Sequence, residues 1–340
     1  MGCFICNLFL PKTFIATRRI CFCVVITNSL YRLYNKKFQT MENIDIVSVC
    51  IITYNSSKYI EETLESVRRQ TYPAIELIIS DDASSDDTVY ICEQWIAKNR
   101  SRFCNALLLK AEKNTGVCGN INRANGAANG RWIKGMAGDD SLMPDAIQSY
   151  VEFCNQSNCQ VCVSGAYFMD EESNPLDIEG EKSLWNHYIE DLECTYPEQK
   201  TMIKHHLLCP GPPMFFSKDV WTVIGGCNAT YAYADEWVMQ YSMLKNGYKL
   251  NPLDKKLIVY RVSKNSLCHN PFETRSYDSQ FGFVKDVIIP DLVHHGHLLD
   301  AWDLFVQKKT QCVIAHKRNF NYKYLLLMSP LYILRRLKIA

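Results

Sequence analysis

Buried strands and amphipathic helices alternate regularly from residue 45 onward, and this alternation constrains the fold more than any other feature of the chain. Between predicted strands, apolar residues recur at helical spacing, as at Ile60, Leu64 and Val67. The strands themselves are near-continuous apolar runs, at residues 46–53, 74–80, 105–111 and 131–137. Units of this kind, each roughly 25–30 residues long, form parallel sheets. We therefore predict an α/β fold with a mostly parallel, doubly wound sheet and helices on both faces.

Three of the predicted strands end in polar residues. These are Thr53, Tyr54 and Asn55 after the first strand, Asp81 and Asp82 after the second, and Asp139 and Asp140 after the fourth. Parallel sheets bind ligands outside the carboxyl ends of their strands, so we expect these residues to meet at one edge. Aspartate is also common in turns and helix caps, and any one pair taken alone fits that structural role.

Adjacent carboxylates such as Asp139 and Asp140 repel one another unless a cation compensates their charge. Oxygen ligands suit Mg²⁺ or Mn²⁺, and such ions usually complete their coordination with phosphate oxygens of a substrate. The sequence has no glycine-rich Walker loop and no G-x-G-x-x-G motif after the first strand. We therefore predict Mg²⁺ or Mn²⁺ as a cofactor that neutralises the diphosphate of a bound nucleotide.

The second half of the sequence is less regular. A helix over residues 234–247 carries Asp235 and Glu236 in its first turn, where the helix dipole favours acids, and ends at Gly247. The other elements predicted here are strands at 160–170 and 256–262, a polar stretch with one or two helices at 171–200, and a turn, short strand and helix across 211–226.

Charge and cysteine content argue against several classes of protein. The net charge of +1, with no basic cluster in the middle of the chain, predicts no nucleic-acid partner. The sixteen cysteines are scattered through apolar runs, which favours small buried side chains in a reducing cytoplasm over a disulfide framework. The alternative is zinc binding by cysteines near the start of the chain, at Cys3, Cys6, Cys21 and Cys23.

Both ends of the chain differ from its middle. No run reaches the roughly 18 apolar residues that span a bilayer, and residues 20–27 lack a secretory cleavage site. Met41 leads straight into the first strand, so residues 1–44 are predicted to be a disordered leader or an upstream extension, which N-terminal mass spectrometry tests. Residues 322–340 combine an apolar face with basic side chains, which fits either a packing helix or an interfacial membrane anchor.

The motifs resemble those of one enzyme family. The resemblance rests on two runs, VSVCIITYNSSKYIEETLESVRRQTYPAIELIISDDASSDDT at 47–88 and NTGVCGNINRANGAANGRWIKGMAGDD at 114–140. Together they resemble the family 2 inverting glycosyltransferases with the GT-A fold, over roughly residues 46–262. AGDD with a later DEW is most similar to bacterial enzymes of capsular, O-antigen or exopolysaccharide synthesis. The resemblance implies transfer of a sugar, with inversion, from a nucleoside-diphosphate sugar to a hydroxyl of a growing, lipid-linked saccharide.

The resemblance also implies roles for the polar strand ends. Asp81 would accept a hydrogen bond from the nucleobase and Asp82 would support its loop. Asp139 and Asp140 occupy the metal motif, whose usual first aspartate is Ala137 here, so the direct metal ligand stays open between them. The full predicted nucleotide-binding group is Thr53, Tyr54, Asn55, Asp81, Asp82, Asn122, Gly138 and Asp139.

The family's catalytic base lies on a later helix, commonly as Glu-Asp before an aromatic or aliphatic residue. This chain has the reversed order Asp235-Glu236-Trp237, and its position before Trp237 favours Glu236 as the base, with Asp235 as the competitor. The alternative is that the two acids have no catalytic role and only stabilise the start of the helix through its dipole. Arg261 would reach a phosphate or the acceptor, as would Trp237, although Ser263 stands where the family often has histidine. His205 and His206 are interpreted first as surface or packing residues, with an acceptor role as the alternative.

These assignments divide the chain into a leader (1–44), a glycosyltransferase domain (45–265) and a helical C-terminal extension (266–340). Within the domain, residues 45–140 are the predicted nucleotide-binding half and 141–265 the acceptor half. Two other functions remain open: a non-catalytic nucleotide-sugar binder or assembly partner, and a sugar nucleotidyltransferase, whose usual Gly-rich loop is missing. The predicted location is the cytoplasm, either free or peripheral on the inner face of the cytoplasmic membrane.

Overall fold

The computed structural model describes residues 44–177, 187–263, 274–316 and 328–329. The described residues from 46 onward belong to one compact unit, and the fold is described for them. Two sequence predictions fall almost wholly outside the described residues: the leader, of which only residue 44 is described, and the segment 322–340, of which only 328 and 329 are. The four cysteines of the N-terminal zinc alternative also lie outside them.

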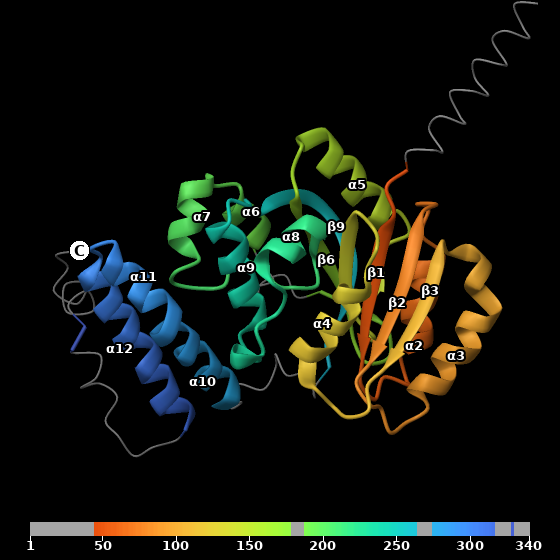
Figure 1. Ribbon diagram of the computed structural model, residues 1–340, viewed down its shortest axis with the longest axis horizontal. Coiled ribbons are helices and arrows are strands. Elements are labelled where there is room, and N and C mark those ends of the chain that lie inside the picture. Colours follow the sequence, from red (N-terminus) through yellow and green to blue (C-terminus); the bar gives the residue numbers. More distant parts are fainter. Residues whose placement is uncertain (1–43, 178–186, 264–273, 317–327, 330–340) are drawn as a thin grey trace, which may run out of the picture. The chain divides into compact units, whose positions relative to one another are not determined.

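Four parallel strands form the first half of the sheet, as the apolar runs predict. They lie in the order β3-β2-β1-β4, with helices over both faces (Figure 1). The strands are β1 (Val47–Thr53), β2 (Ile75–Asp81), β3 (Asn105–Lys110) and β4 (Trp132–Ala137). Between them run α2 (Ile60–Arg68), α3 (Thr88–Asn99), the 3-10 helix η1 (Arg100–Arg102) and α4 (Gly116–Ala127). All seven residues of β2 are buried, which explains why its sequence reads as one apolar run.

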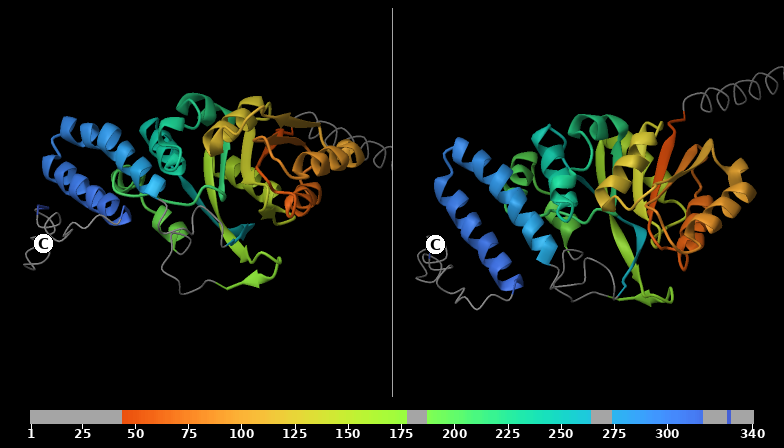
Figure 2. Two further views of the ribbon diagram at one scale, coloured as in Figure 1. Left: turned by 90° about the horizontal axis from the view of Figure 1, so that it is seen from below. Right: turned by 60° about the horizontal axis from the view of Figure 1, so that its bottom comes forward.

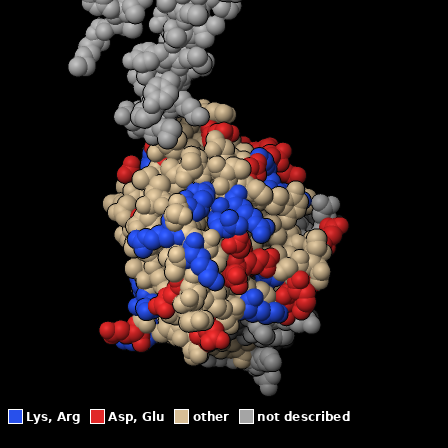
Figure 3. Space-filling view, turned by 90° about the vertical axis from the view of Figure 1, so that its right-hand side faces the viewer, with Lys and Arg blue, Asp and Glu red and all other residues tan. Residues whose placement is uncertain are grey.

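The amphipathic pattern of α2 buries the side that the sequence predicts. Ile60, Leu64 and Val67 are buried, while Glu61 and Glu62 stand in the first turn, where they interact favourably with the helix dipole. The face over α3 and β3 carries lysine and arginine interspersed with acids (Figure 3). Ion pairs on these elements join Lys110 to Glu93 at 3.0 Å and, on α2, Arg68 to Glu65 at 2.7 Å.

Beyond β4 the sheet becomes mixed. β8 (Met214–Ser217) runs antiparallel to β4, and β6 (Val161–Met169) runs antiparallel to β8. β9 (Asn251–Arg261) then lies parallel to β6, and β5 (Ser141–Leu142) closes the order antiparallel to β9. The short β7 (Pro175–Leu176) pairs with β6 outside this order. The predicted parallel sheet thus holds for the first half, and these short strands add the antiparallel pairs.

The helices of the second half are α5 (Ala146–Ser157), α6 (Tyr188–Leu192), α7 (Tyr196–Met202), α8 (Lys218–Ile224), the 3-10 helix η2 (Ala229–Tyr231) and α9 (Asp235–Lys245). The helix predicted over residues 234–247 is therefore confirmed as α9. Its C-terminal neighbour residue Gly247 has a φ of 94°, the left-handed conformation that glycine adopts without strain.

The helical C-terminal region packs against α9. It comprises α10 (Thr274–Phe283), the π-helix η4 (Val284–Ile288), α11 (Ile289–His294) and α12 (Leu298–Ala315), with α10 and α12 side by side (Figure 2). The Phe283 ring lies 5.5–5.6 Å from the rings of Tyr231, Trp237 and Tyr241. Within the described residues, no helix is both long and apolar enough to cross a bilayer.

Candidate functional site

The three polar strand ends meet at one edge of the sheet. β1 lies between β2 and β4, Thr53 pairs with Asp81, and Ile52 pairs with Ala137. Gly138 packs directly on the end of β1: a Cβ there would lie 2.8 Å from Thr53 Cγ2 and 3.3 Å from the Ile52 carbonyl oxygen. A side chain at position 138 would therefore separate the two strand ends, so glycine is required by the close approach.

Asp81 organises the loop after β1. Its carboxylate is 1% exposed and accepts hydrogen bonds from Thr53 Oγ1 at 2.8 Å and from the Ser84 backbone N–H at 2.9 Å. Asn55 reaches the same segment, because its backbone N–H donates to Ser84 Oγ at 2.8 Å and its Oδ1 accepts from the Ser85 N–H at 2.9 Å. Tyr54 stays 52% exposed above this edge. The predicted nucleobase loop is thus fixed by hydrogen bonds, with an aromatic side chain open to solvent.

Asp82 fastens the start of α4 to the end of β2. It accepts from the N–H groups of Thr115 and Gly116 at 2.9 and 2.8 Å, from Thr115 Oγ1 at 2.6 Å and from Arg123 at 3.1 Å. Burial alone would raise the pKa of Asp82, but the hydrogen bonds from Thr115 and Arg123 outweigh burial and hold that pKa below its usual value. Asp82 is therefore ionised and committed to the protein.

Asp139 and Asp140 are desolvated carboxylates at the end of β4. Asp140 is 1% exposed; its Oδ1 accepts from the Arg261 N–H at 3.1 Å, and its Oδ2 is buried with no hydrogen-bond partner among the described residues. Burial, followed by repulsion from Asp139, raises the pKa of Asp140 well above its usual value. Burial also raises the pKa of Asp139. A buried carboxylate oxygen without a partner is costly, so this pair calls for a cation or a proton.

Arg261 is buried beneath this edge, and its guanidinium bonds to the protein. Its Nε donates to the Asp139 carbonyl at 3.0 Å and one terminal nitrogen donates to Glu62 at 2.6 Å. The other terminal nitrogen donates to the Asp170 carbonyl and to Ser173 Oγ, both at 2.9 Å. These four hydrogen bonds hold the backbone at Asp139 against α2 and the segment after β6. The predicted contact of Arg261 with phosphate or acceptor stays a prediction.

Asp235 and Glu236 begin α9 in partly buried positions. Glu236 Oε1 accepts from the Gly211 N–H at 2.9 Å. Burial, with repulsion from Asp235, raises the pKa of Glu236 to about 8, and burial raises that of Asp235 to about 6. Trp237 is buried, and its indole N–H donates to the Ile203 carbonyl at 2.6 Å, so that polar group is already used within the protein.

Lys134 links β4 to the turn that contacts Glu236, a structural role that sequence reasoning missed. It is fully buried within β4, and its ammonium donates to the carbonyls of Gly135 at 2.8 Å, Met214 at 3.4 Å and Pro212. Pro212 follows Gly211, whose N–H orients Glu236. Burial lowers the pKa of Lys134 to about 7, against the opposing charge of Asp140. A lone lysine inside an apolar strand was the available signal. His205 and His206, just before this turn, are exposed.

We expect Gly211→Ala to lower turnover while leaving nucleotide binding intact. A Cβ at position 211 would lie 2.5 Å from Glu236 Oε1 and 3.0 Å from its Cδ, so the carboxylate must move and its hydrogen bond from the Gly211 N–H is broken. If Glu236 is the base that the sequence predicts, its displacement costs on the order of 100-fold in kcat. Steady-state kinetics beside nucleotide titration measures both quantities. Gly135→Ala, which meets nothing within 4 Å, is the matched control.

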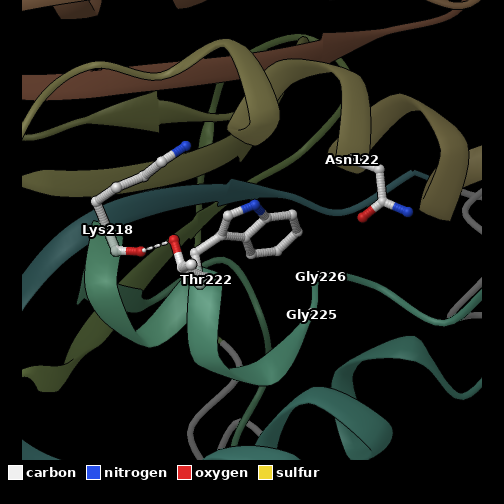
Figure 4. Close-up of a pocket in the computed structure, with 6 residues that line it drawn as sticks. Asn122, Lys218, Thr222, Gly225 and Gly226 are labelled. Carbon is white, nitrogen blue, oxygen red and sulfur yellow. Dashed lines mark hydrogen bonds between the residues drawn. The ribbon is translucent and has the colours of Figure 1, made fainter.

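Asn122 lies away from this edge's hydrogen-bond network and bonds to the loop after α8. Its Nδ2 donates to the Cys227 carbonyl at 2.9 Å, and its Oδ1 accepts from the Cys227 N–H at 2.8 Å. It borders a shallow cavity of about 350 Å³ together with Trp221, Gly226 and residues of α8 (Figure 4). The predicted nucleotide contact of Asn122 stays a prediction, because both polar atoms of its amide hold the Cys227 backbone.

Comparison with known proteins gives a match to the family model "Glycosyl transferase family 2" over residues 48–223. A curated relative, the putative teichuronic acid biosynthesis glycosyltransferase TuaG of Bacillus subtilis, is 28% identical over 230 residues, covering 67% of this chain and 83% of that one. The matches to the next three curated relatives span only 28–41% of the length of those proteins.

Solved structures show the same fold. TarS 1–349 of S. aureus in complex with UDP-GlcNAc aligns with a TM-score of 0.56 at 17% identity, covering 86% of this chain and 88% of that one. The mannosyltransferase PcManGT of Pyrobaculum calidifontis, in complex with GDP-Man and Mn²⁺, aligns with a TM-score of 0.52 at 15% identity, covering 94% and 97%. At these identities the likeness concerns the fold alone.

Proposed function

We propose that this chain, which belongs to glycosyl transferase family 2, moves a sugar from a nucleoside-diphosphate sugar to a hydroxyl of a growing surface saccharide and inverts the anomeric carbon. The observation that carries the proposal is the meeting of three polar strand ends, with the Asp139–Asp140 pair among them, at one edge of the sheet. Parallel α/β sheets bind nucleotides at such an edge. The neighbouring structures with UDP-GlcNAc and GDP-Man support a nucleotide-sugar donor.

We propose Asp139 and Asp140 as the holders of Mg²⁺ or Mn²⁺. The partnerless Oδ2 of Asp140 and the raised pKa values of both carboxyls fit a hard divalent cation, which takes oxygen ligands. When bound, the ion neutralises charge that develops on the departing diphosphate. Arg261 fixes the Asp139 backbone and the position of Asp140, so its part is to orient the motif.

We propose Glu236 as the general base. The Gly211 N–H orients its carboxylate, and a pKa of about 8 makes it a stronger proton acceptor than an ordinary glutamate. In a single displacement, Glu236 takes the proton from the acceptor hydroxyl while that oxygen bonds to the anomeric carbon and the diphosphate leaves. Asp235 is the competing base, with a pKa of about 6.

The experiment that tests this function titrates UDP, GDP and dTDP, with and without Mn²⁺, and screens the matching sugar nucleotides for hydrolysis and transfer. We expect metal-dependent binding of one nucleoside diphosphate and turnover of its sugar. Binding without turnover on any acceptor would instead identify a nucleotide-sugar binder. Formation of a sugar nucleotide and pyrophosphate from a sugar phosphate and a nucleoside triphosphate would identify a nucleotidyltransferase.

We also propose that α12 rests on an anionic membrane, because lipid-linked saccharides are presented there. Leu298 and Leu299 at its start are each 62% exposed and Trp302 is 44% exposed, while basic residues follow the helix in the sequence. We expect the double change Leu298→Ser and Leu299→Ser to lower co-sedimentation with anionic vesicles several-fold. Val223→Ser, an exposed apolar residue of α8, is the control. Unchanged sedimentation of the double variant contradicts the proposal.

A further inference from the structure

A second group of metal-ligand side chains lies at the start of α9. It consists of Cys118 on α4, Cys227 in the loop after α8 and Asp235, the first residue of α9. One ligand atom of each residue lies within 4.8 Å of the other two, and no other such group of three occurs among the described residues. We propose that Cys118, Cys227 and Asp235 together bind one zinc ion.

The spacing of these atoms fits a tetrahedral ion after small side-chain movements. Zinc bonds of about 2.3 Å to sulfur and about 2.0 Å to oxygen separate neighbouring ligand atoms by roughly 3.5–3.8 Å. The three ligand atoms already lie within 4.8 Å of one another, and they come from three separate segments. Three protein ligands leave the fourth position to water, as in open zinc sites.

The donor atoms distinguish this group from the pair at the end of β4. Two thiolates and one carboxylate select zinc or another soft ion over Mg²⁺, whereas Asp139 and Asp140 offer only oxygen. Cys118 and Cys227 are 1% and 5% exposed, which shields their sulfurs from solvent. Asp235 is only partly buried, so an ion and its water can enter from that side.

The backbone around Cys227 is held in place by the neighbouring turn of α4. Asn122 stands four residues after Cys118, on the same face of that helix, and bonds to both the N–H and the carbonyl of Cys227. Gly226 permits this approach: its φ is 84°, and a Cβ there would lie 2.7 Å from Asn122 Oδ1. Supporting contacts of this kind orient metal ligands and raise affinity.

The test uses the full-length protein, kept reduced, stripped with a chelator, loaded with zinc and desalted. We expect the parent to retain one equivalent of zinc that Cys118→Ser and Cys227→Ser each lose. Cobalt in place of zinc should give a thiolate charge-transfer band that is absent from both variants. Two controls should keep that equivalent: Cys92→Ser, a buried cysteine on α3, and the quadruple change of Cys3, Cys6, Cys21 and Cys23 to serine.

The variant Asp235→Asn tests the zinc site without replacing a buried cysteine. Because it removes one direct ligand, we expect zinc affinity to fall by more than the roughly 10–100-fold that a lost supporting contact costs. Circular dichroism melts establish that each variant is folded. Equal zinc content in the parent, Cys118→Ser and Cys227→Ser, or loss of zinc only in the quadruple variant, would overturn the proposal.

This zinc site does not depend on the proposed sugar transfer, since metal content and the cobalt spectrum are read without a substrate. Failure of transfer with retained zinc therefore leaves the site standing. If both proposals hold, the zinc-loaded protein has the Asp235 carboxylate committed to the metal. Glu236 is then the acid at this helix start that can accept a proton.

Discussion

Glu236→Gln lowers kcat by about 10²–10⁴-fold while nucleotide binding stays within about twofold of the parent, because the change removes the proton acceptor and keeps the shape of the side chain. The Gly211 N–H still finds an oxygen on the glutamine, so the local structure survives. In the zinc-free parent, kcat/KM rises with pH through about 8, since the base must be unprotonated to act, and burial with repulsion from Asp235 raises the pKa of Glu236 to about 8. Steady-state rates from pH 6 to 9 and calorimetric titration of the nucleotide measure these effects.

Asp235→Asn is the matched control for this assignment. In the zinc-free protein, removing the negative charge of Asp235 removes one of the causes that raise the pKa of Glu236, so the rise of kcat/KM with pH should move to lower pH while activity is retained. A dead Asp235→Asn enzyme beside an active Glu236→Gln enzyme would reverse the roles of the two acids.

Asp140→Asn abolishes metal-dependent nucleotide binding. We expect metal affinity to fall by more than about 100-fold, because losing a hydrogen-bond partner of a metal ligand already costs up to about 100-fold and this change removes a ligand itself. Without metal, the same variant is at least as stable as the parent. It removes a buried carboxylate whose pKa is raised by burial and by repulsion from Asp139, while the asparagine side-chain oxygen can still accept from the Arg261 N–H.

Nucleotide titration with and without Mn²⁺, followed by thermal melts of the metal-free proteins, separates these two effects. Asp139→Asn should weaken metal-dependent binding as well, and the larger loss of the two identifies the direct ligand. Asp145→Asn, an exposed acid at the start of α5, is the control that should bind metal and nucleotide as the parent does. Full Mn²⁺-dependent binding by both Asp139→Asn and Asp140→Asn would remove the metal site from this edge.

The first half of the fold was predictable because each of its strands and helices is marked by a pattern of neighbouring residues in the sequence. Each strand there is a buried apolar run, and the polar residues that end β1, β2 and β4 follow it directly in the sequence. Parallel pairing then brings those ends together without further information. In the second half, the strands predicted at 160–170 and 256–262 occur as β6 and β9, and the short strand and helix predicted across 211–226 occur as β8 and α8. The sequence did not predict their antiparallel pairing or β5, whose two residues are too few for any periodicity to appear.

Contacts between distant segments explain the rest of what sequence reasoning missed. Arg261 meets Glu62 across 199 positions, and Lys134 reaches Pro212 across 78. In the sequence, Cys118 and Cys227 resemble ordinary buried cysteines. Only the fold, through the loop after α8, places them beside Asp235. Charged residues inside apolar strands, such as Lys134 and Arg261, were the signals that most merited attention, since a buried charge requires partners.

The aromatic contacts of Phe283 limit how far this protein can be truncated from its C-terminus. The matched family region ends at residue 223, yet the ring that closes the far side of α9 is supplied 60 positions later. A protein shortened before α10 would expose Trp237, the immediate neighbour of Glu236, to water. Stopping at residue 223 would remove α9 and Glu236 altogether, and stopping between α9 and α10 would remove the ring that covers Trp237, so the minimal folded unit includes α10.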